Sequence, residues 1–143
     1  MLFGFYVLDD QLIAPTTARV QENHYREVEP VLVVAAFDEK AVAEAIAQTL
    51  SRGNPPAPQR PLSETPQPVV LKYAKIKRWS LFEKKSRQWV IEQEDGLWRL
   101  CRHKPVIGSQ GTTLDEDAIM PLGNADLDIA ELAARASKII CNP

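Results

Sequence analysis

Apolar and polar residues come in short blocks at the start of the chain, and these blocks predict a β-hairpin. An apolar run with aromatics extends from Phe3 to Leu8, Asp9-Asp10 interrupts it, and residues 12–14 resume it. Neighbouring residues on both faces of these segments are apolar, which indicates strands inside a sheet. Further along, the β-branched run at residues 31–34 predicts a buried strand, and residues 25–28 a weaker one.

Two segments have the period of an amphipathic helix. The apolar positions are Val42, Ile46 and Leu50 in the first, and Ile129, Leu132, Ala133, Ala136 and Ile140 in the second. Asp38 is placed to cap the first helix at its N-terminus, and Gly53 is placed to end it. Asp126 or Asp128 is placed to cap the second. We expect these two helices to be the main ones of the fold.

A second hairpin is predicted around Asp95-Gly96, because this dipeptide lies between two alternating runs. A two-residue turn would place Glu92 opposite Arg99, as an oppositely charged cross-strand pair. The apolar face would carry Trp89, Ile91, Trp98 and Leu100. Turn, register and faces agree, so this hairpin should form the rigid centre of the fold.

The remaining segments complete a single α+β domain over residues 1–143. Six prolines between residues 53 and 68 predict a Pro-rich surface loop. After it, residues 69–71 are expected to restart the sheet, and the capping-box spacing from Ser80 to Glu83 predicts a short helix near 80–86. Residues 104–125 are expected to be loop-like. The predicted fold is α+β, a mostly antiparallel sheet of about five to seven strands with two main helices packed on it.

The distribution of charge along the chain is more informative than the composition, because 45% hydrophobic and 25% charged residues are ordinary for a globular protein. The net charge is −4 over residues 1–71, +6 over 72–104 and −4 over 105–143. A basic middle between acidic ends concerns partners and encounter rates, not the fold. The chain has no apolar run near the roughly 20 residues that span a membrane, and its first residues lack the features of a signal peptide. We therefore expect a cytoplasmic protein without a membrane partner.

The residues that could carry chemistry form no recognisable catalytic or cofactor motif. Cys101 and His103 share one side of a predicted strand, but a closed zinc site needs four ligands, and only the remote His24 and Cys141 could complete it. The cluster Asp115, Glu116 and Asp117 lacks the alternation of a calcium-binding loop and is expected to be a solvated acidic loop. We expect no metal, no cofactor and no catalytic residue; an enzyme of unrecognised type is the third hypothesis.

A basic stretch over residues 72–87 offers an alternative binding surface. Its cations include Lys75, Lys77, Arg78, Lys84 and Lys85. Aromatic residues, Trp79 and Phe82 among them, are interleaved with these, and such a combination can bind single-stranded nucleic acid. In the alternative interpretation, the aromatic residues belong to the hydrophobic core and the lysines form a solvated surface. The overall pI near 5.7 favours this alternative interpretation, so nucleic acid is not the expected partner.

The chain as a whole resembles the small bacterial toxin-immunity proteins of contact-dependent growth inhibition. The resemblance rests on the length, the absence of a catalytic set, the runs at residues 5–20 and 69–74, and the Trp-containing hairpin at 89–100. It implies a cytoplasmic, non-enzymatic protein that binds a cognate toxin domain, often a nuclease, and blocks its active site. An acidic surface would meet the basic cleft of such a toxin. The expected contact residues are Asp115, Glu116, Asp117, Asp126 and Asp128.

Overall fold

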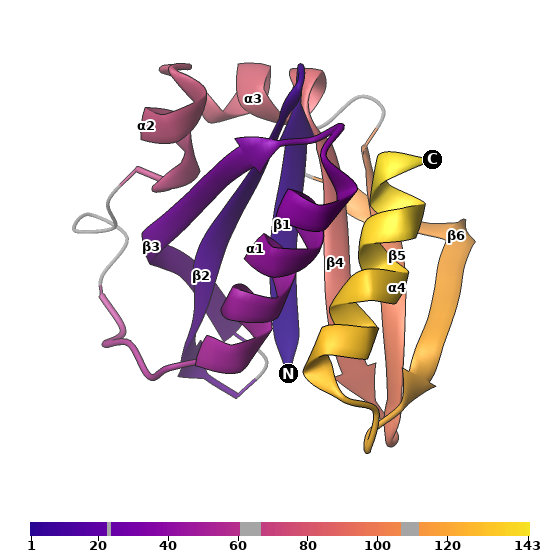
Figure 1. The fold of residues 1–143 in the computed structure, drawn as a ribbon. Coiled ribbons are helices and arrows are strands. Elements are labelled where there is room, and N and C mark those ends of the chain that lie inside the picture. The colour runs from indigo at the N-terminus through magenta and orange to yellow at the C-terminus, as the bar shows by residue number, and fades with distance from the viewer. Residues whose placement is uncertain (23, 61–66, 107–111) are drawn as a thin grey trace.

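The fold is built around one six-stranded sheet with the strand order β3-β2-β1-β4-β5-β6 (Figure 1). A computed structural model describes residues 1–22, 24–60, 67–106 and 112–143. The strands are β1 (Leu2–Leu8), β2 (Gln11–Gln21), β3 (His24–Ala35), β4 (Arg87–Glu94), β5 (Leu97–Pro105) and β6 (Thr112–Asn124). All neighbouring strands are antiparallel, so the predicted α+β class is confirmed. None of the helices among the described residues is both long and apolar enough to cross a membrane.

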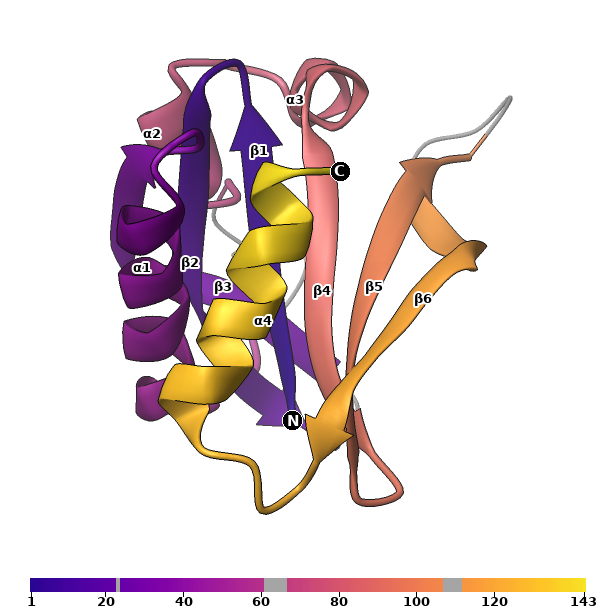
Figure 2. The same cartoon turned by 45° about the vertical axis from the view of Figure 1, so that its right-hand side comes forward.

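The two predicted main helices, α1 (Glu39–Arg52) and α4 (Ile129–Cys141), lie side by side on one face of the sheet, here called the first face (Figure 2). Asp38 caps α1 by accepting a hydrogen bond from the Ala41 amide, and Gly53 ends it with a φ of 66°. Asp128, not Asp126, caps α4. The predicted stripe of α4 is buried except for Ile129. Both helices therefore bury the faces that their periods indicated.

Among the described residues, the helices on the opposite or second face lie near one end of the sheet; they are the two short helices α2 (Val70–Ala74) and α3 (Trp79–Lys85) (Figure 1). The expectation of a strand at residues 69–71 is wrong. Val70 and Leu71 are buried in a small cluster with residues of β1 and β2, and this packing outweighs their β propensity. A helix near 80–86 is confirmed, but the capping box is wrong, because α3 begins at Trp79 and Ser80 lies in its first turn.

The strands are longer than expected, and both sheet edges differ from the sequence expectation. β3 continues from residue 24 to 35 through a cis Glu29-Pro30 bond, and residues 31–34 are half-buried or exposed rather than core, because β3 is an edge strand. The expectation of a loop over residues 104–125 is wrong where the structure describes it. Thr112–Asn124 form β6, the other edge strand. The glycines and prolines of this segment favoured a loop in the sequence analysis, but an edge strand tolerates both residue types.

The Asp95-Gly96 hairpin is confirmed in turn, register and faces. Glu94 pairs with Leu97 and Ile91 with Leu100, as the two-residue turn requires. Its apolar face lies on the first face of the sheet, within the main core. On the other face, Arg99 contacts Glu92 at 2.6 Å and also pairs with Glu94.

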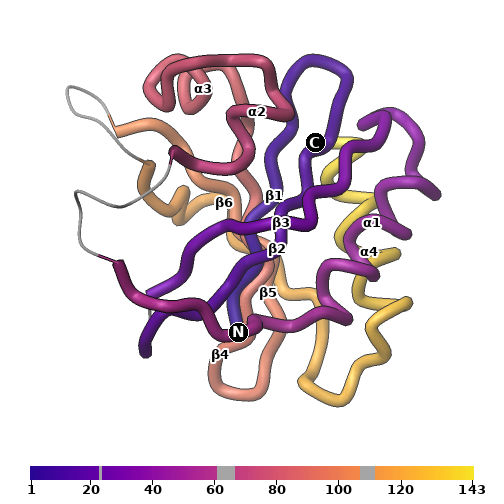
Figure 3. The backbone as a smooth tube through the Cα atoms, turned by 90° about the vertical axis from the view of Figure 1, so that its left-hand side faces the viewer, coloured from indigo at the N-terminus to yellow at the C-terminus, as the bar shows by residue number. Residues whose placement is uncertain are grey.

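A side-chain clip joins β1 to β2 where their backbones no longer pair. The described pairing between these strands covers only residues 6–8 with 11–13. Beyond it, the Asn54 amide donates to the carbonyls of Leu2 and Thr17, its oxygen accepts from the Leu2 amide, and the Thr17 hydroxyl accepts from the Gly4 amide. Residues 55–57 then bond to Arg19 as a short bridge, so the start of the Pro-rich segment runs beside the N-terminus (Figure 3). The predicted Pro-rich loop continues into residues 61–66, which lie outside the described part.

Candidate functional site

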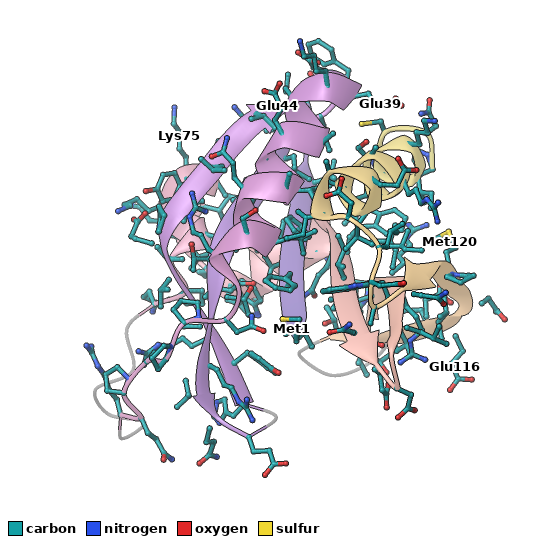
Figure 4. The ribbon with its side chains drawn as sticks, turned by 60° about the horizontal axis from the view of Figure 1, so that its bottom comes forward. Met1, Glu39, Glu44, Lys75, Glu116 and Met120 are labelled. Carbon is teal, nitrogen blue, oxygen red and sulfur yellow. The ribbon has the colours of Figure 1, made fainter. Side chains whose placement is uncertain are left out.

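The acidic residues Asp115, Glu116 and Asp117 form a bulge in the edge strand β6, here called the acidic bulge. Cys101 of β5 is opposite Ile119 and His103 is opposite Leu114, so residues 115–118 occupy the space of one residue on β5. The Asp117 amide donates to Asp115, whose carboxylate also lies 3.6 Å from Lys104. Glu116 and Asp117 are exposed, and Figure 4 shows Glu116 at the rim of the sheet. The expected loop is thus a strand bulge, while two of its carboxylates do face solvent.

Asp126 and Asp128 lie at the other end of β6 and do not join the acidic bulge. Asp128 serves as the N-cap of α4, and Asp126 is exposed in the preceding turn. The adjacent Ala125 amide bonds to Gly96, which places this turn beside the tip of the β4–β5 hairpin. Seven residues of extended chain from Asp117 to Asn124 correspond to about 20 Å. The five acids predicted as one contact surface are therefore two separate groups.

The basic stretch exposes its cations but not its aromatic rings. Lys75, Lys77, Arg78, Lys84 and Lys85 are all exposed on and between α2 and α3. Phe82 is buried and Trp79 half-buried, and both rings pack on Tyr6, with centroids 5.0 Å and 6.1 Å away. The rings that would stack on bases are thus part of the second-face packing.

The thiol and imidazole noted in the sequence have ordinary structural surroundings. Cys101 is buried, its thiol donates to Glu92 at 3.6 Å, and burial raises its pKa to about 11. Burial also lowers the pKa of His103. Within the described ranges, no group of three or more His, Cys, Asp or Glu residues is placed to hold a metal ion.

A pocket on the second face was not anticipated from the sequence. It has a volume of about 310 Å³ and lies beside α3, across the four strands from the edge strand β3 to β4. The side chains and backbone that shape it include Gly4, Tyr6, Tyr25, Glu27, Trp79 and Gln88. Three aromatic rings and one carboxylate thus converge on a hollow, here called the Glu27 pocket.

Glu27 places its carboxyl group inward over the sheet. Tyr6 donates its hydroxyl hydrogen to Glu27 Oε1, and the Gln88 amide donates to the Tyr6 oxygen at 3.5 Å. A Cβ atom at Gly4 would come within 3.1 Å of the same Oε1, so the glycine makes room for the carboxyl group. The residue as a whole is half-buried, while this inward carboxyl group is the part that loses water.

Burial sets the protonation of this pair. Desolvation raises the pKa of Glu27 to about 7, and the hydrogen bond from Tyr6 opposes it only in part. Burial, followed by the neighbouring Glu27 charge, also raises the pKa of Tyr6 well above its usual value. Near neutral pH, the pocket therefore holds a carboxyl group that is half ionised and a phenol that stays protonated.

One sequence signal could have pointed to the pocket. Gly4 interrupts an otherwise apolar strand, and an isolated glycine inside a strand indicates a close approach by another group. That signal does not identify the approaching group, because the approach of the Glu27 side chain to Gly4 depends on the short β1–β2 pairing and on the register of β3.

Comparison with known proteins gives the fold and no activity. No protein-family model matches the sequence, and no curated protein matches it. The structure is similar to that of a protein of unknown function from Neisseria meningitidis, with a TM-score of 0.63 and 11% sequence identity. The similarity covers 99% of this chain and 94% of that one. Such a likeness shows a shared architecture, whereas function depends on the individual site.

Proposed function

We propose that this chain is a non-enzymatic binding protein that neutralises a cognate bacterial toxin, and that the acidic bulge of β6 contacts the toxin. The observation that carries the proposal is the exposure of Glu116 and Asp117 in a bulge on a free sheet edge. Within the described ranges neither carboxylate takes part in an ion pair. Both charges are therefore available to a partner.

Charge and strand position suit a basic partner for two physical reasons. A nuclease toxin must hold phosphates in a basic cleft, and clustered carboxylates on an inhibitor raise the association rate and fix orientation. A bulge also re-aims side chains and ends the regular ladder, which keeps other strands from pairing with this edge. Binding would then occur through side chains of the acidic bulge rather than by addition of a seventh strand.

The test uses the full chain and the C-terminal domain of the large secreted protein that, under this proposal, is encoded just upstream. The variant Glu116→Gln/Asp117→Asn removes two charges and leaves the Asp115–Lys104 contact in place. We expect it to slow association about tenfold at low salt, as measured by surface plasmon resonance. The matched control Glu22→Gln/Glu44→Gln removes two exposed charges elsewhere and should change the rate less than about twofold.

An unchanged association rate, with toxin-expressing cells still protected, would move the interface away from the acidic bulge. No binding and no protection by the unmodified chain would end the proposal itself.

The alternative function is a nucleic-acid-associated accessory role for the basic stretch, favoured by the exposure of Lys75, Lys77 and Arg78. Phosphate contacts from these cations would make binding fall steeply with salt. The inward packing of Trp79 and Phe82 supports this role less than exposed rings would. Tight single-stranded DNA or RNA binding near 0.15 M salt that Lys75→Glu/Lys77→Glu/Arg78→Glu abolishes would favour this alternative over the toxin.

A further inference from the structure

The Glu27 carboxyl group lacks a cation partner within the described part of the chain. Its hydrogen-bond donor is the neutral Tyr6 hydroxyl, and the ion pairs of the described residues involve other carboxylates. Arg26 is the nearest cation in sequence and also lines the pocket, but it forms no ion pair with Glu27 among the described residues. Buried charges in proteins are ordinarily paired. This one faces a cavity instead.

We propose that the Glu27 pocket binds an organic cation, an alkylammonium or alkylguanidinium group, with Glu27 as counter-charge and Tyr6, Tyr25 and Trp79 as aromatic walls. This site is independent of the proposed toxin contact, which lies on the β6 edge.

The walls of the pocket fit such a group. A cation near the face of Trp or Tyr is attracted by the ring quadrupole, and aromatic cages of this kind recognise ammonium groups. The volume of about 310 Å³ is at the small end of ligand pockets, which suits a group the size of a Lys or Arg side chain. Val90 and Leu2 add apolar surface for the alkyl part.

The surrounding charges limit what can enter. Arg26, Arg60 and Lys72 border an adjoining cavity of about 400 Å³ that shares Glu27 as a wall. Lys72 is already held by Glu29 at 2.9 Å. The cations that border the adjoining cavity would repel a second positive charge on the ligand. They still allow one positive charge beside Glu27. A monocation is therefore the expected ligand.

Binding should depend on pH through Glu27. The titratable or charged groups around it are Tyr6 of β1, Tyr25 and Arg26 of β3, Glu83 of α3, and Arg60 and Lys72 beside the adjoining cavity. With a pKa of about 7, the ionised fraction of Glu27 rises about tenfold from pH 6 to pH 8. The affinity for a cation should rise by a similar factor over this interval.

The test is an NMR titration of the full chain that follows the Trp79 indole N–H. The probes are n-butylammonium and n-butylguanidinium, with neutral n-butylurea as the isosteric control. We expect saturable shifts with a dissociation constant near 1 mM at pH 8, in line with the few atoms of each probe. Glu27→Gln should weaken binding at least tenfold and remove the pH dependence, while Glu44→Gln, an exposed acid on α1, should bind like the unmodified chain.

A second variant keeps the Glu27 carboxyl group but shifts its position in the pocket. Gly4→Ala would place a Cβ atom 3.1 Å from Glu27 Oε1 and press on the carboxyl group. We expect weaker cation binding with an intact NMR spectrum. If both Glu27→Gln and Gly4→Ala bind like the unmodified chain, or if butylurea binds as well as the cations, the proposal is wrong. Absence of any saturable shift up to about 20 mM probe would also overturn it, because that is far above the expected constant.

Two capped peptides distinguish between the two possible natural sources of the cation, a side chain of a partner protein and a free small molecule. Acetyl-Gly-Arg-Gly-amide and acetyl-Gly-Lys-Gly-amide present the same groups on a protein backbone. Binding as tight as that of the free amines would assign the pocket to a basic side chain of a partner protein. Binding of the free amines alone would assign it to a small metabolite-like cation.

Discussion

The two faces of the sheet are built differently, and their difference separates what stabilises the protein from what it exposes. On the first face, α1 and α4 run beside each other over a continuous core that includes Phe3, Phe5 and Trp98 (Figure 2). On the second face, α2 and α3 are short and cover a smaller core, with six buried residues among those described. Beyond them lies the Glu27 pocket. One face is closed by packing, while the other leaves polar groups in a hollow.

This contrast follows from helix length and period. A helix of three to four turns with an apolar stripe can cover several strands, whereas α2 and α3 are limited to 5 and 7 residues. Beyond these short helices a buried carboxyl group can persist, since no described residue of α2 or α3 forms an ion pair with Glu27. We therefore expect substitutions on the first face to change stability and substitutions beyond α3 to change binding.

The largest contrast should separate two tryptophans. Trp98 lies on the first face, 6% exposed and 6.4 Å from the ring of Phe3, while Trp79 on the second face is half-buried. Trp98→Ala should lower the free energy of unfolding by roughly 3–5 kcal/mol, because it leaves a cavity in the main core. Trp79→Ala should lower it by about 1–2 kcal/mol. Equal losses in denaturant melts would contradict the difference between the faces.

The clip between β1 and β2 should have the next largest effect. Asn54→Ala removes three hydrogen bonds and leaves the backbone groups of Leu2 and Thr17 without them, which should cost about 2 kcal/mol. Asn142→Ala is the matched control, because its amide contacts lie at the exposed end of α4. That control should cost under about 0.5 kcal/mol by the same melts. A similar value for both variants would show that the clip is dispensable.

The charge of Glu27 should make stability fall as pH rises. Its folded pKa of about 7 lies above the ordinary value of 4.5, so between these values the folded state holds the proton more tightly than the unfolded state. The stabilisation is full below pH 4.5 and is lost through pH 7. Glu27→Gln should therefore gain about 2 kcal/mol relative to the unmodified chain between pH 5.5 and pH 8. Urea melts at both pH values measure this, and a difference that stays constant would show an ordinary Glu27.

The smallest effect is expected for the charged pair on the hairpin. Glu92→Ala should cost under about 1 kcal/mol, because the pair is partly solvated and Arg99 keeps its contact with Glu94. Glu94→Ala, at the more exposed partner, should cost less still. A loss comparable to that of Trp98→Ala would mean that this part of the second face stabilises the fold as the core does.

The sequence predicted the closed face well and the open face poorly. Asp38, Gly53 and the stripe of α4 are local signals, since a cap and a helical period depend on residues within a few turns. The Asp95-Gly96 turn likewise sets its own register. Each of these elements is determined by residues close to it in the sequence, so it can be predicted without knowing which distant segments it packs against.

The features that the sequence analysis did not predict depend instead on contacts between distant segments. Val70 and Leu71 are helical because of the residues that they pack against, and β6 forms because it can pair with β5. The Glu27 pocket needs Gly4 and Tyr6 of β1 to be brought together with Glu27 of β3. The acidic bulge was found as a cluster of charges, but its bulge and its separation from Asp128 depend on pairing that composition does not encode. Such features arise from long-range register.

A 13C NMR titration of the Glu27 side-chain carboxyl tests most directly whether the second face holds a desolvated, unpaired charge. In the full chain without added ligand, the carboxyl resonance should titrate with a midpoint near 7. Addition of n-butylammonium should move this midpoint to lower pH, because the cation binds the ionised form. A midpoint near the ordinary 4.5 that the amine leaves unchanged would show a solvated carboxylate and contradict the difference between the two faces.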